Sequence, residues 1–157
     1  MDLTKLGRNE RALAIVGVLA LIDTFLPWYS WSVGPISGSW SGWNSGFDAW
    51  FPLLLLVAIG VLVALPAFGQ TVVVRGGYAA FAAASLLATV LILIRWLTFD
   101  SQSAVYASIG PDFGTYVGLI IGIAATVFAY LGFTAAGGTL NNFADAFKAH
   151  PGQQPPQ

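Results

Sequence analysis

Four long apolar runs constrain the fold of this chain more than any other feature of its sequence. They cover approximately residues 12–28, 49–68, 77–99 and 113–136. The length of each run is close to the ~20 residues that a helix needs to cross a bilayer. Their apolar character is nearly continuous around the helix, which is typical of helices that face both lipid and each other. The runs therefore predict an all-α polytopic membrane protein, an antiparallel bundle of four transmembrane helices.

The composition excludes several other classes of protein. The chain has 157 residues, of which 57% are hydrophobic and 8% are charged, whereas soluble domains have about 25% charged residues. A net charge of −1 with dispersed basic residues predicts no nucleic-acid partner. The absence of cysteine excludes disulfides, thiolate metal sites and thiol catalysis.

The basic residues predict the orientation. They lie before the first run, between the second and third runs, and after the fourth run (Lys5, Arg8, Arg11, Arg75 and Lys148). The two other connections, residues 32–48 and 100–112, contain no Lys or Arg. Because cytoplasmic loops favour Lys and Arg, we expect both termini to be cytoplasmic.

The first run has an alternative interpretation as a cleaved signal peptide, since basic residues precede it. No A-x-A-like cleavage site follows the run, only the large aromatic residues Phe25, Trp28 and Tyr29. We therefore expect an uncleaved signal anchor.

The remaining segments are short. Residues 1–11 form a cytoplasmic N-terminal segment, and the four-helix domain covers residues 12–136. In residues 137–149 an apolar stripe predicts an amphipathic helix on the cytoplasmic leaflet (Leu140, Phe143, Ala144 and Phe147). Residues 150–157 are expected to be a disordered tail.

Aromatic residues gather on the side that lacks Lys and Arg. Indole rings settle at the headgroup level of a membrane, so these residues are interpreted as interfacial anchors. The stretch FLPWYSW, Phe25–Trp31, would mark where the first span leaves the hydrocarbon, with Pro27 ending the helix. The predicted anchors are Trp28, Tyr29, Trp31, Trp40, Trp43, Trp50 and Trp96.

Small residues recur every fourth position on two of the runs. Such stripes let membrane helices approach closely. We expect the third run to pack on the fourth within one chain, and the alternative is a homodimer or partner-binding face. The packing residues are Gly114, Gly118 and Gly122 on the fourth run, and Ala80 and Ala84 on the third.

Asp23 and Arg95 are the charged residues that the runs enclose. A lone charge in lipid costs at least ~2.5–3.5 kcal/mol, so pairing or snorkelling is expected. The two residues lie at similar distances from the outer ends of their spans, which makes an ion pair plausible, with Asp48 and Asp100 as rival partners of Arg95. In a structural interpretation the pair fixes helix register; in a functional one it lines a polar site for a lipid headgroup, an ion or a proton.

No set of residues indicates catalysis. His150 lies in the tail with no ligand-spaced neighbours, and no phosphate-binding loop or carboxylate cluster is present. We therefore expect no enzymatic activity, no cofactor and no metal. The weakest alternative, an enzyme acting on lipids, would need Asp100 or Asp112 to join Asp23 in one cleft.

Four motifs carry a resemblance to a family. They are LPWYS at Leu26–Ser30, W-x-x-G-F-x-A-W-F at Trp43–Phe51, Arg95 near the end of the third run, and G-x-Y-x-G-L-I at Gly114–Ile120. With these motifs the chain resembles uncharacterised small four-span membrane proteins of high-GC Gram-positive bacteria. The resemblance implies a four-helix fold in the plasma membrane, and it implies no activity.

Two hypotheses for function follow. The first is a structural or accessory protein that contacts membrane lipids and packs with a membrane-protein partner or as a homo-oligomer. The alternative is a protein that handles a small ligand, a lipid or an ion at a polar site containing Asp23 and Arg95.

Overall fold

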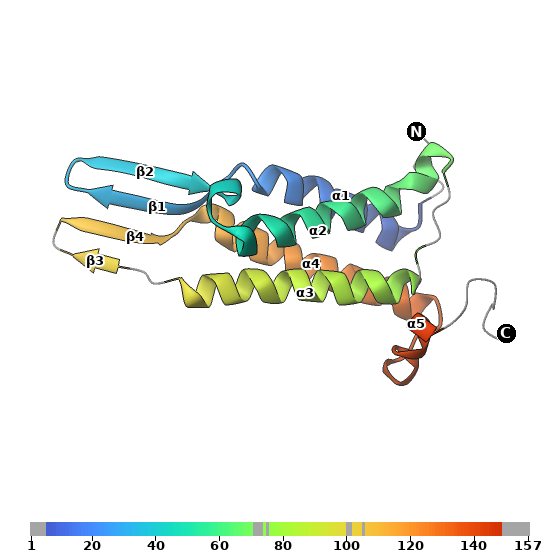
Figure 1. Ribbon diagram of the computed structural model, residues 1–157. Helices are drawn as coiled ribbons and strands as arrows, with labels where there is room; N and C mark the ends of the chain where they lie inside the picture. Colours follow the sequence, from blue (N-terminus) through green and yellow to red (C-terminus); the bar gives the residue numbers. More distant parts are fainter. Residues whose placement is uncertain (1–5, 71–73, 75, 100–101, 105, 149–157) are drawn as a thin grey trace.

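The computed structural model describes residues 6–70, 74, 76–99, 102–104 and 106–148. Within this part of the chain, four long helices lie side by side (Figure 1): α1 (Arg8–Asp23), α2 (Phe47–Ala64), α3 (Gly77–Thr98) and α4 (Phe113–Ala135). Helices α1 and α3 each pack on both α2 and α4, so the four helices enclose a common core. The short helix η3 (Leu65–Phe68) continues α2.

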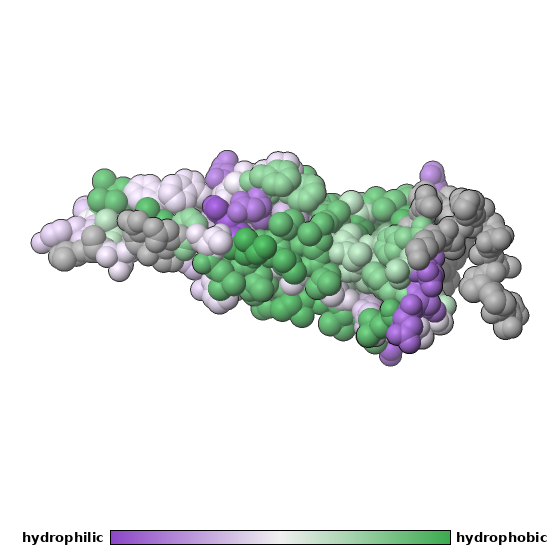
Figure 2. All heavy atoms as spheres, turned by 60° about the horizontal axis from the view of Figure 1, so that its bottom comes forward, coloured by the Kyte–Doolittle hydropathy of each residue, from purple (hydrophilic) through white to green (hydrophobic). Residues whose placement is uncertain are grey.

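Three of these helical segments are long and apolar enough to cross a membrane: Phe47–Phe68, Gly77–Thr98 and Phe113–Ala135. Large apolar side chains face outward from α3 and α4, among them Leu87 and Ile120. Figure 2 shows the result, a broad hydrophobic surface over the helices with hydrophilic residues toward its two ends. Helix α1 is shorter, with 16 residues and three charged residues in its first turn.

A four-stranded antiparallel sheet stands at one end of the bundle, so the prediction of an all-α fold is wrong. The strands are β1 (Pro27–Val33), β2 (Ile36–Ser41), β3 (Gln102–Ala104) and β4 (Ala107–Pro111). Their order is β2-β1-β4-β3, so β1 and β4 join two segments that are far apart in the sequence. We call this end of the bundle the sheet end and the opposite end the tail end (Figure 1).

The sheet forms where the sequence alternates between polar and apolar residues. YSWSV in β1 and ISGSWS in β2 alternate with period two, as expected for a strand with two different faces. The two-residue turn between them begins with Gly34 at φ +58, in the left-handed region that glycine adopts without strain.

Helix α1 ends at Asp23, five residues before the predicted end of its span. Pro27 lacks an N–H group and begins β1 instead. The carbonyl oxygen of Asp23 accepts hydrogen bonds from the N–H of Leu26 (3.1 Å) and from Nε1 of Trp28 (3.2 Å). The stretch FLPWYSW therefore turns the chain from helix into strand.

The predicted amphipathic segment, residues 137–149, is not one continuous helix. It contains the short helices η4 (Leu140–Asn142) and α5 (Asp145–Lys148). Phe143 packs edge-on against Phe133 of α4, with ring centroids 5.3 Å apart. An aromatic side chain of this segment thus covers the tail end of the bundle. Residues 1–5 and the predicted tail, 150–157, lie outside the described residues.

The small residues have more varied contacts than predicted. Gly122 lies against Thr89 of α3, and Ala84 of α3 packs against the core. Ala80, also on α3, is half-buried. Gly114 and Gly118 instead face β1 and the end of α1.

Helices α1 and α2 approach each other closely where Gly17 of α1 meets Gly60 of α2. A Cβ atom added at Gly60 would lie 2.6 Å from Cα of Gly17, and one added at Gly17 would lie 2.7 Å from Cα of Gly60. Backbone atoms cannot yield as side chains do, so these glycines set the spacing of α1 and α2.

We predict that Gly60→Ala destabilises the protein by about 1–3 kcal/mol, because the added methyl group overpacks the crossing. The better helix propensity of alanine, up to about 1 kcal/mol, offsets only part of this loss. Thermal unfolding in detergent measures the effect. The control is Gly110→Ala on β4, where the added Cβ meets nothing within 4 Å. Equal unfolding temperatures for the two variants would contradict the close approach.

Candidate functional site

The strongest candidate for a functional site is a layer of polar side chains where the helices meet the sheet. These side chains come from α1, β1, the start of α2, the end of α3 and the first turn of α4. We call this layer the polar neck, and its members are Asp23, Thr24, Trp28, Tyr29, Ser45, Asp48, Arg95 and Thr115.

Asp23 is the most unusual member of the polar neck. It is 0% exposed, and neither of its carboxylate oxygens has a hydrogen-bond partner among the described residues. Oδ2 points toward Gly118 of α4, where an added Cβ would lie 2.7 Å away. Burying a carboxylate without a partner is costly, so we expect this carboxylate to bind a proton or a cation.

Trp28 fills the space beside Asp23. Its indole N–H donates to the backbone carbonyl of Asp23 and leaves the carboxylate unpaired. A Cβ added at Gly114 would lie 2.6 Å from Cδ1 of Trp28, so a side chain at that position would displace the indole. Thr115 Oγ1 donates to the carbonyl oxygen of Trp28 at 2.6 Å, which ties β1 to α4.

Arg95 connects three segments on another side of the neck. Its Nη2 donates to the carbonyl oxygen of Ser45 at 2.6 Å, and its Nη1 lies 3.5 Å from Oδ2 of Asp48. The guanidinium carbon lies 5.1 Å from the ring centroid of Tyr29 and 5.4 Å from that of Phe99. Cation–π contact and a charge-assisted hydrogen bond therefore hold the start of α2 and β1 against the end of α3.

The phenol of Tyr29 is enclosed between these groups. Its ring stacks on Phe99 with centroids 3.9 Å apart, and its hydroxyl is buried without a hydrogen-bond partner among the described residues. Burial raises the pKa of Tyr29, and the charge of Arg95 offsets part of this rise. The phenol is thus held neutral and available as a donor.

The ion pair considered from the sequence, Asp23 with Arg95, is not formed. Arg95 pairs with Asp48, one of the two rivals, whereas Asp100 lies outside the described residues. Asp112 accepts from the N–H of Phe113 at 2.7 Å and caps α4. That carboxylate is therefore engaged at the start of its own helix.

The interpretation of Trp28 and Tyr29 as interfacial anchors is wrong, because both side chains are buried inside the protein. Trp31 and Trp40 lie on the sheet, with ring centroids 6.5 Å apart. The other three tryptophans lie at the sheet end of the helices. Trp43 stacks on Trp50, and Trp96 meets Tyr116 edge-on.

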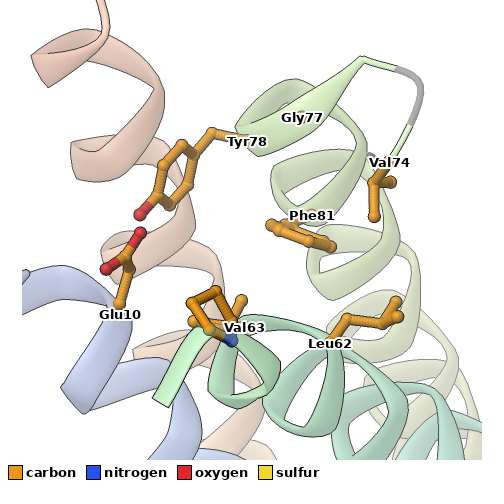
Figure 3. Close-up of a pocket in the computed structure, with 8 residues that line it drawn as sticks. Glu10, Leu62, Val63, Val74, Gly77, Tyr78 and Phe81 are labelled. Atoms are coloured by element: carbon orange, nitrogen blue, oxygen red, sulfur yellow. The ribbon is translucent and has the colours of Figure 1, made fainter. Parts of the chain in front are cut away.

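A hollow of about 160 Å³ lies at the tail end between α1, α2 and α3 (Figure 3). Val63 and Phe81 contribute to its apolar lining, and the hydroxyl of Tyr78 points toward the carboxylate of Glu10. Oε2 of Glu10 also accepts from the N–H of Gly7 at 2.7 Å, which satisfies a free donor at the start of α1. The carboxylate therefore already has a structural role.

Neither a family model, a curated protein nor a solved structure matches the chain in comparisons with known proteins. Within the described residues, no group of three His, Cys, Asp or Glu side chains could hold a metal ion.

Sequence reasoning named Asp23 and Arg95 but missed three members of the neck: Thr24, Ser45 and Thr115. Thr115 gives no signal in the sequence, because its role depends on the pairing of β1 with β4. Ser45 contributes a backbone carbonyl, which any residue has. Only the alternating pattern of β1 could have indicated that a strand crosses this layer.

We predict that Arg95→Met lowers the free energy of unfolding by about 1.5–3 kcal/mol, because it removes a charge-assisted hydrogen bond to a backbone carbonyl. Arg95→Lys should be intermediate, since lysine keeps the charge but loses the planar guanidinium. Thermal unfolding in detergent measures both variants.

Asp48→Asn is the matched control for the ion pair. Its effect on stability should be small, because the side chain of Asp48 is 38% exposed and its Oδ2 lies 3.5 Å from Nη1 of Arg95. If Arg95→Met were as stable as the unsubstituted chain, Arg95 would not hold the neck together.

Proposed function

We propose that the chain is a four-pass protein of the plasma membrane with both termini in the cytoplasm. The sheet would then stand on the extracytoplasmic side. The distribution of basic residues supports this orientation, since Arg8 and Arg11 belong to the tail end and the sheet contains no Lys or Arg. The family resemblance of the sequence points to the same membrane.

The outward face of α1 supports its role as the fourth span. Ile15, Val18 and Ile22 are exposed on the protein, as expected for side chains that lipid covers. Because α1 packs on α2 and α4, this face lies at the depth of two candidate spans. Residues 12–23 cover about 18 Å at 1.5 Å per residue, and the apolar residues Phe25 and Leu26 extend this length.

Within that membrane, we propose a non-enzymatic structural or accessory function that depends on packing with a partner. The observation that carries this proposal is the sheet. It projects beyond the helices and leaves large apolar side chains such as Val33 and Ile36 exposed. Contiguous exposed apolar surface of this kind marks interaction sites. Arg95, Tyr29 and Thr115 support the sheet through contacts within the chain.

Native mass spectrometry of membranes extracted in a mild detergent tests this function. We expect assemblies heavier than the 16.5 kDa chain that contain at least one further polypeptide. A chain that is strictly solitary, both in detergent and after crosslinking in native membranes, would contradict the accessory function.

The unpartnered carboxylate of Asp23 favours a second candidate function, proton or cation handling. It is the one fully buried charge-bearing side chain in the described part of the neck, and both of its oxygens are available. Ionisable groups in such places often mark ion pathways in membrane proteins.

For this second function we predict that the purified chain, reconstituted in vesicles, changes the internal pH under an imposed proton gradient. Asp23→Asn should abolish the change while the unfolding temperature stays close to that of the unsubstituted chain, because the amide has the same shape. The control is Asp112→Asn, which keeps a good helix cap. Equal rates of pH change for the unsubstituted chain and for Asp23→Asn would reject this second candidate function.

A further inference from the structure

The indole of Trp28 fills a slot whose nearest walls are glycine backbone. A Cβ added at Gly114 of α4 would lie 2.6 Å from Cδ1 of the indole, and one added at Gly118 would lie 2.9 Å from Cζ2. On a third side stands Gly42 of the short helix η2 (Gly42–Asn44), where an added Cβ would lie 3.3 Å from Nε1. Three glycines from two segments thus let the chain close around this side chain, which is 0% exposed. We call this space the indole slot.

The carboxylate of Asp23 borders the same slot. The Cβ position at Gly118 that lies 2.9 Å from the indole also lies 2.7 Å from Oδ2 of Asp23. Neither carboxylate oxygen accepts a hydrogen bond from a described residue, and the side chain is 0% exposed. The indole therefore stands beside an acidic group that no described side chain stabilises in its ionised form.

Water can reach Asp23 more readily from the sheet end than from the tail end. Toward the tail end, the next turns of α1, α2 and α4 bury apolar side chains, and an apolar interior stays dry (Ala20, Leu56, Ile121 and Ala125). Toward the sheet end, Gly42 is buried, whereas Trp43 and Asn44 beside it are exposed. A single layer of backbone therefore separates the indole slot from the surface at the sheet end.

The backbone of Trp28 is held more firmly than its side chain. Its carbonyl oxygen accepts hydrogen bonds from Thr115 Oγ1 at 2.6 Å and from the N–H of Asp112 at 2.8 Å. The indole makes one hydrogen bond to the described residues, 3.2 Å long, and its acceptor is the carbonyl oxygen of Asp23. A change of side-chain rotamer would therefore move the indole out of its slot while β1 stays attached to α4.

The other charged or titratable groups do not neutralise Asp23. Those described at this end of the bundle come from β1, α2, α3 and the start of α4 (Tyr29, Asp48, Arg95, Asp112 and Tyr116). Arg95 pairs with Asp48, and Asp112 caps α4. None of the five forms a hydrogen bond with the carboxylate of Asp23. The state of Asp23 is therefore set by its own proton and by the access of water.

The oxygens around Asp23 suit a proton better than a metal ion. Hard cations such as Ca²⁺ and Mg²⁺ take six or more oxygen ligands, whereas Asp23 offers two carboxylate oxygens. The carbonyl oxygens of Asp23 and Trp28 already accept hydrogen bonds, and the hydroxyl of Thr24 donates to the carbonyl of Leu21. A proton needs only one oxygen of the carboxylate.

We propose that Asp23 is a proton-binding site gated by Trp28: the indole closes the site while the carboxyl holds its proton, and leaves the slot when the proton is released. On release the carboxyl O–H bond breaks, its electron pair stays on Asp23, and a water molecule takes the proton. The ionised carboxylate then needs hydrogen-bond donors, which water supplies in the vacated slot. This inference rests on the second candidate function, and it names the ion and the gate.

Fluorine NMR of the chain in lipid nanodiscs, with fluorotryptophan at its six tryptophan positions, follows the indole directly. The Trp28 resonance is the one missing from Trp28→Phe. We expect this resonance to shift as the pH rises, and a water-soluble paramagnetic chelate to broaden it only at the higher pH. Both changes should be absent in Asp23→Asn, which stays neutral. They should persist in Asp112→Asn, the control next to the same backbone contact.

The rate of proton movement tests the gate independently. In reconstituted vesicles under an imposed proton gradient, Trp28→Phe should change the internal pH several-fold faster than the unsubstituted chain, because the phenyl ring is smaller and has no N–H. Trp96→Phe is the matched control and should leave the rate unchanged, since Trp96 meets Tyr116 away from the slot. The unfolding temperatures of both variants show that the chain folds.

Failure of the gate and failure of the second candidate function give different results. A Trp28 resonance that does not respond to pH, or responds equally in Asp23→Asn, would overturn the proposal. So would equal vesicle rates for Trp28→Phe and the unsubstituted chain, although a loss of the pH change in Asp23→Asn would still support proton handling. If the unsubstituted chain changed no internal pH and its Trp28 resonance did not respond, both would be rejected.

Discussion

The close approach of β1 to the first turn of α4 is the contact on which the sheet end depends. The carbonyl oxygen of Trp28 accepts hydrogen bonds from Thr115 Oγ1 at 2.6 Å and from the N–H of Asp112 at 2.8 Å. Gly114 makes this approach possible, because any side chain there would meet the indole of Trp28. Once β1 is fixed at α4, it aligns with β4, which directly precedes that helix, and β2 follows through its two-residue turn.

The sequence alone was sufficient for three of the long helices and insufficient for the sheet. The apolar runs predicted α2, α3 and α4 to within a few residues, because continuous hydrophobicity over that length has few other solutions. The strands were missed because YSWSV and ISGSWS contain aromatic residues that a membrane belt explains equally well. The pairing of residues 27–33 with residues 107–111 joins segments that no local pattern connects.

The two enclosed charges show a similar limit. Their positions along the spans were read correctly as lying near one end, but a linear sequence gives no rotation of one helix relative to another. Arg95 turns toward the start of α2, where Nη2 meets the carbonyl of Ser45 and Nη1 meets the carboxylate of Asp48. Asp23 turns toward Gly118, and no described group there donates a hydrogen bond to its carboxylate. Contacts within the chain therefore explain why a charge is present at Arg95. They do not explain the buried carboxylate of Asp23.

The same reasoning applies to the sheet. A sheet gains most of its stability from a buried face, and here Tyr29 is buried whereas its paired neighbour Trp40 is 40% exposed. The outer rows are held by their strand hydrogen bonds and by contacts such as that of Trp31 with Gly38. Burial of their exposed side chains would therefore increase the order of the hairpin, since whatever binds only the ordered form stabilises it. The helices thus hold the sheet at its base, while the outermost pair of β1 and β2, Val33 and Ile36, stays exposed.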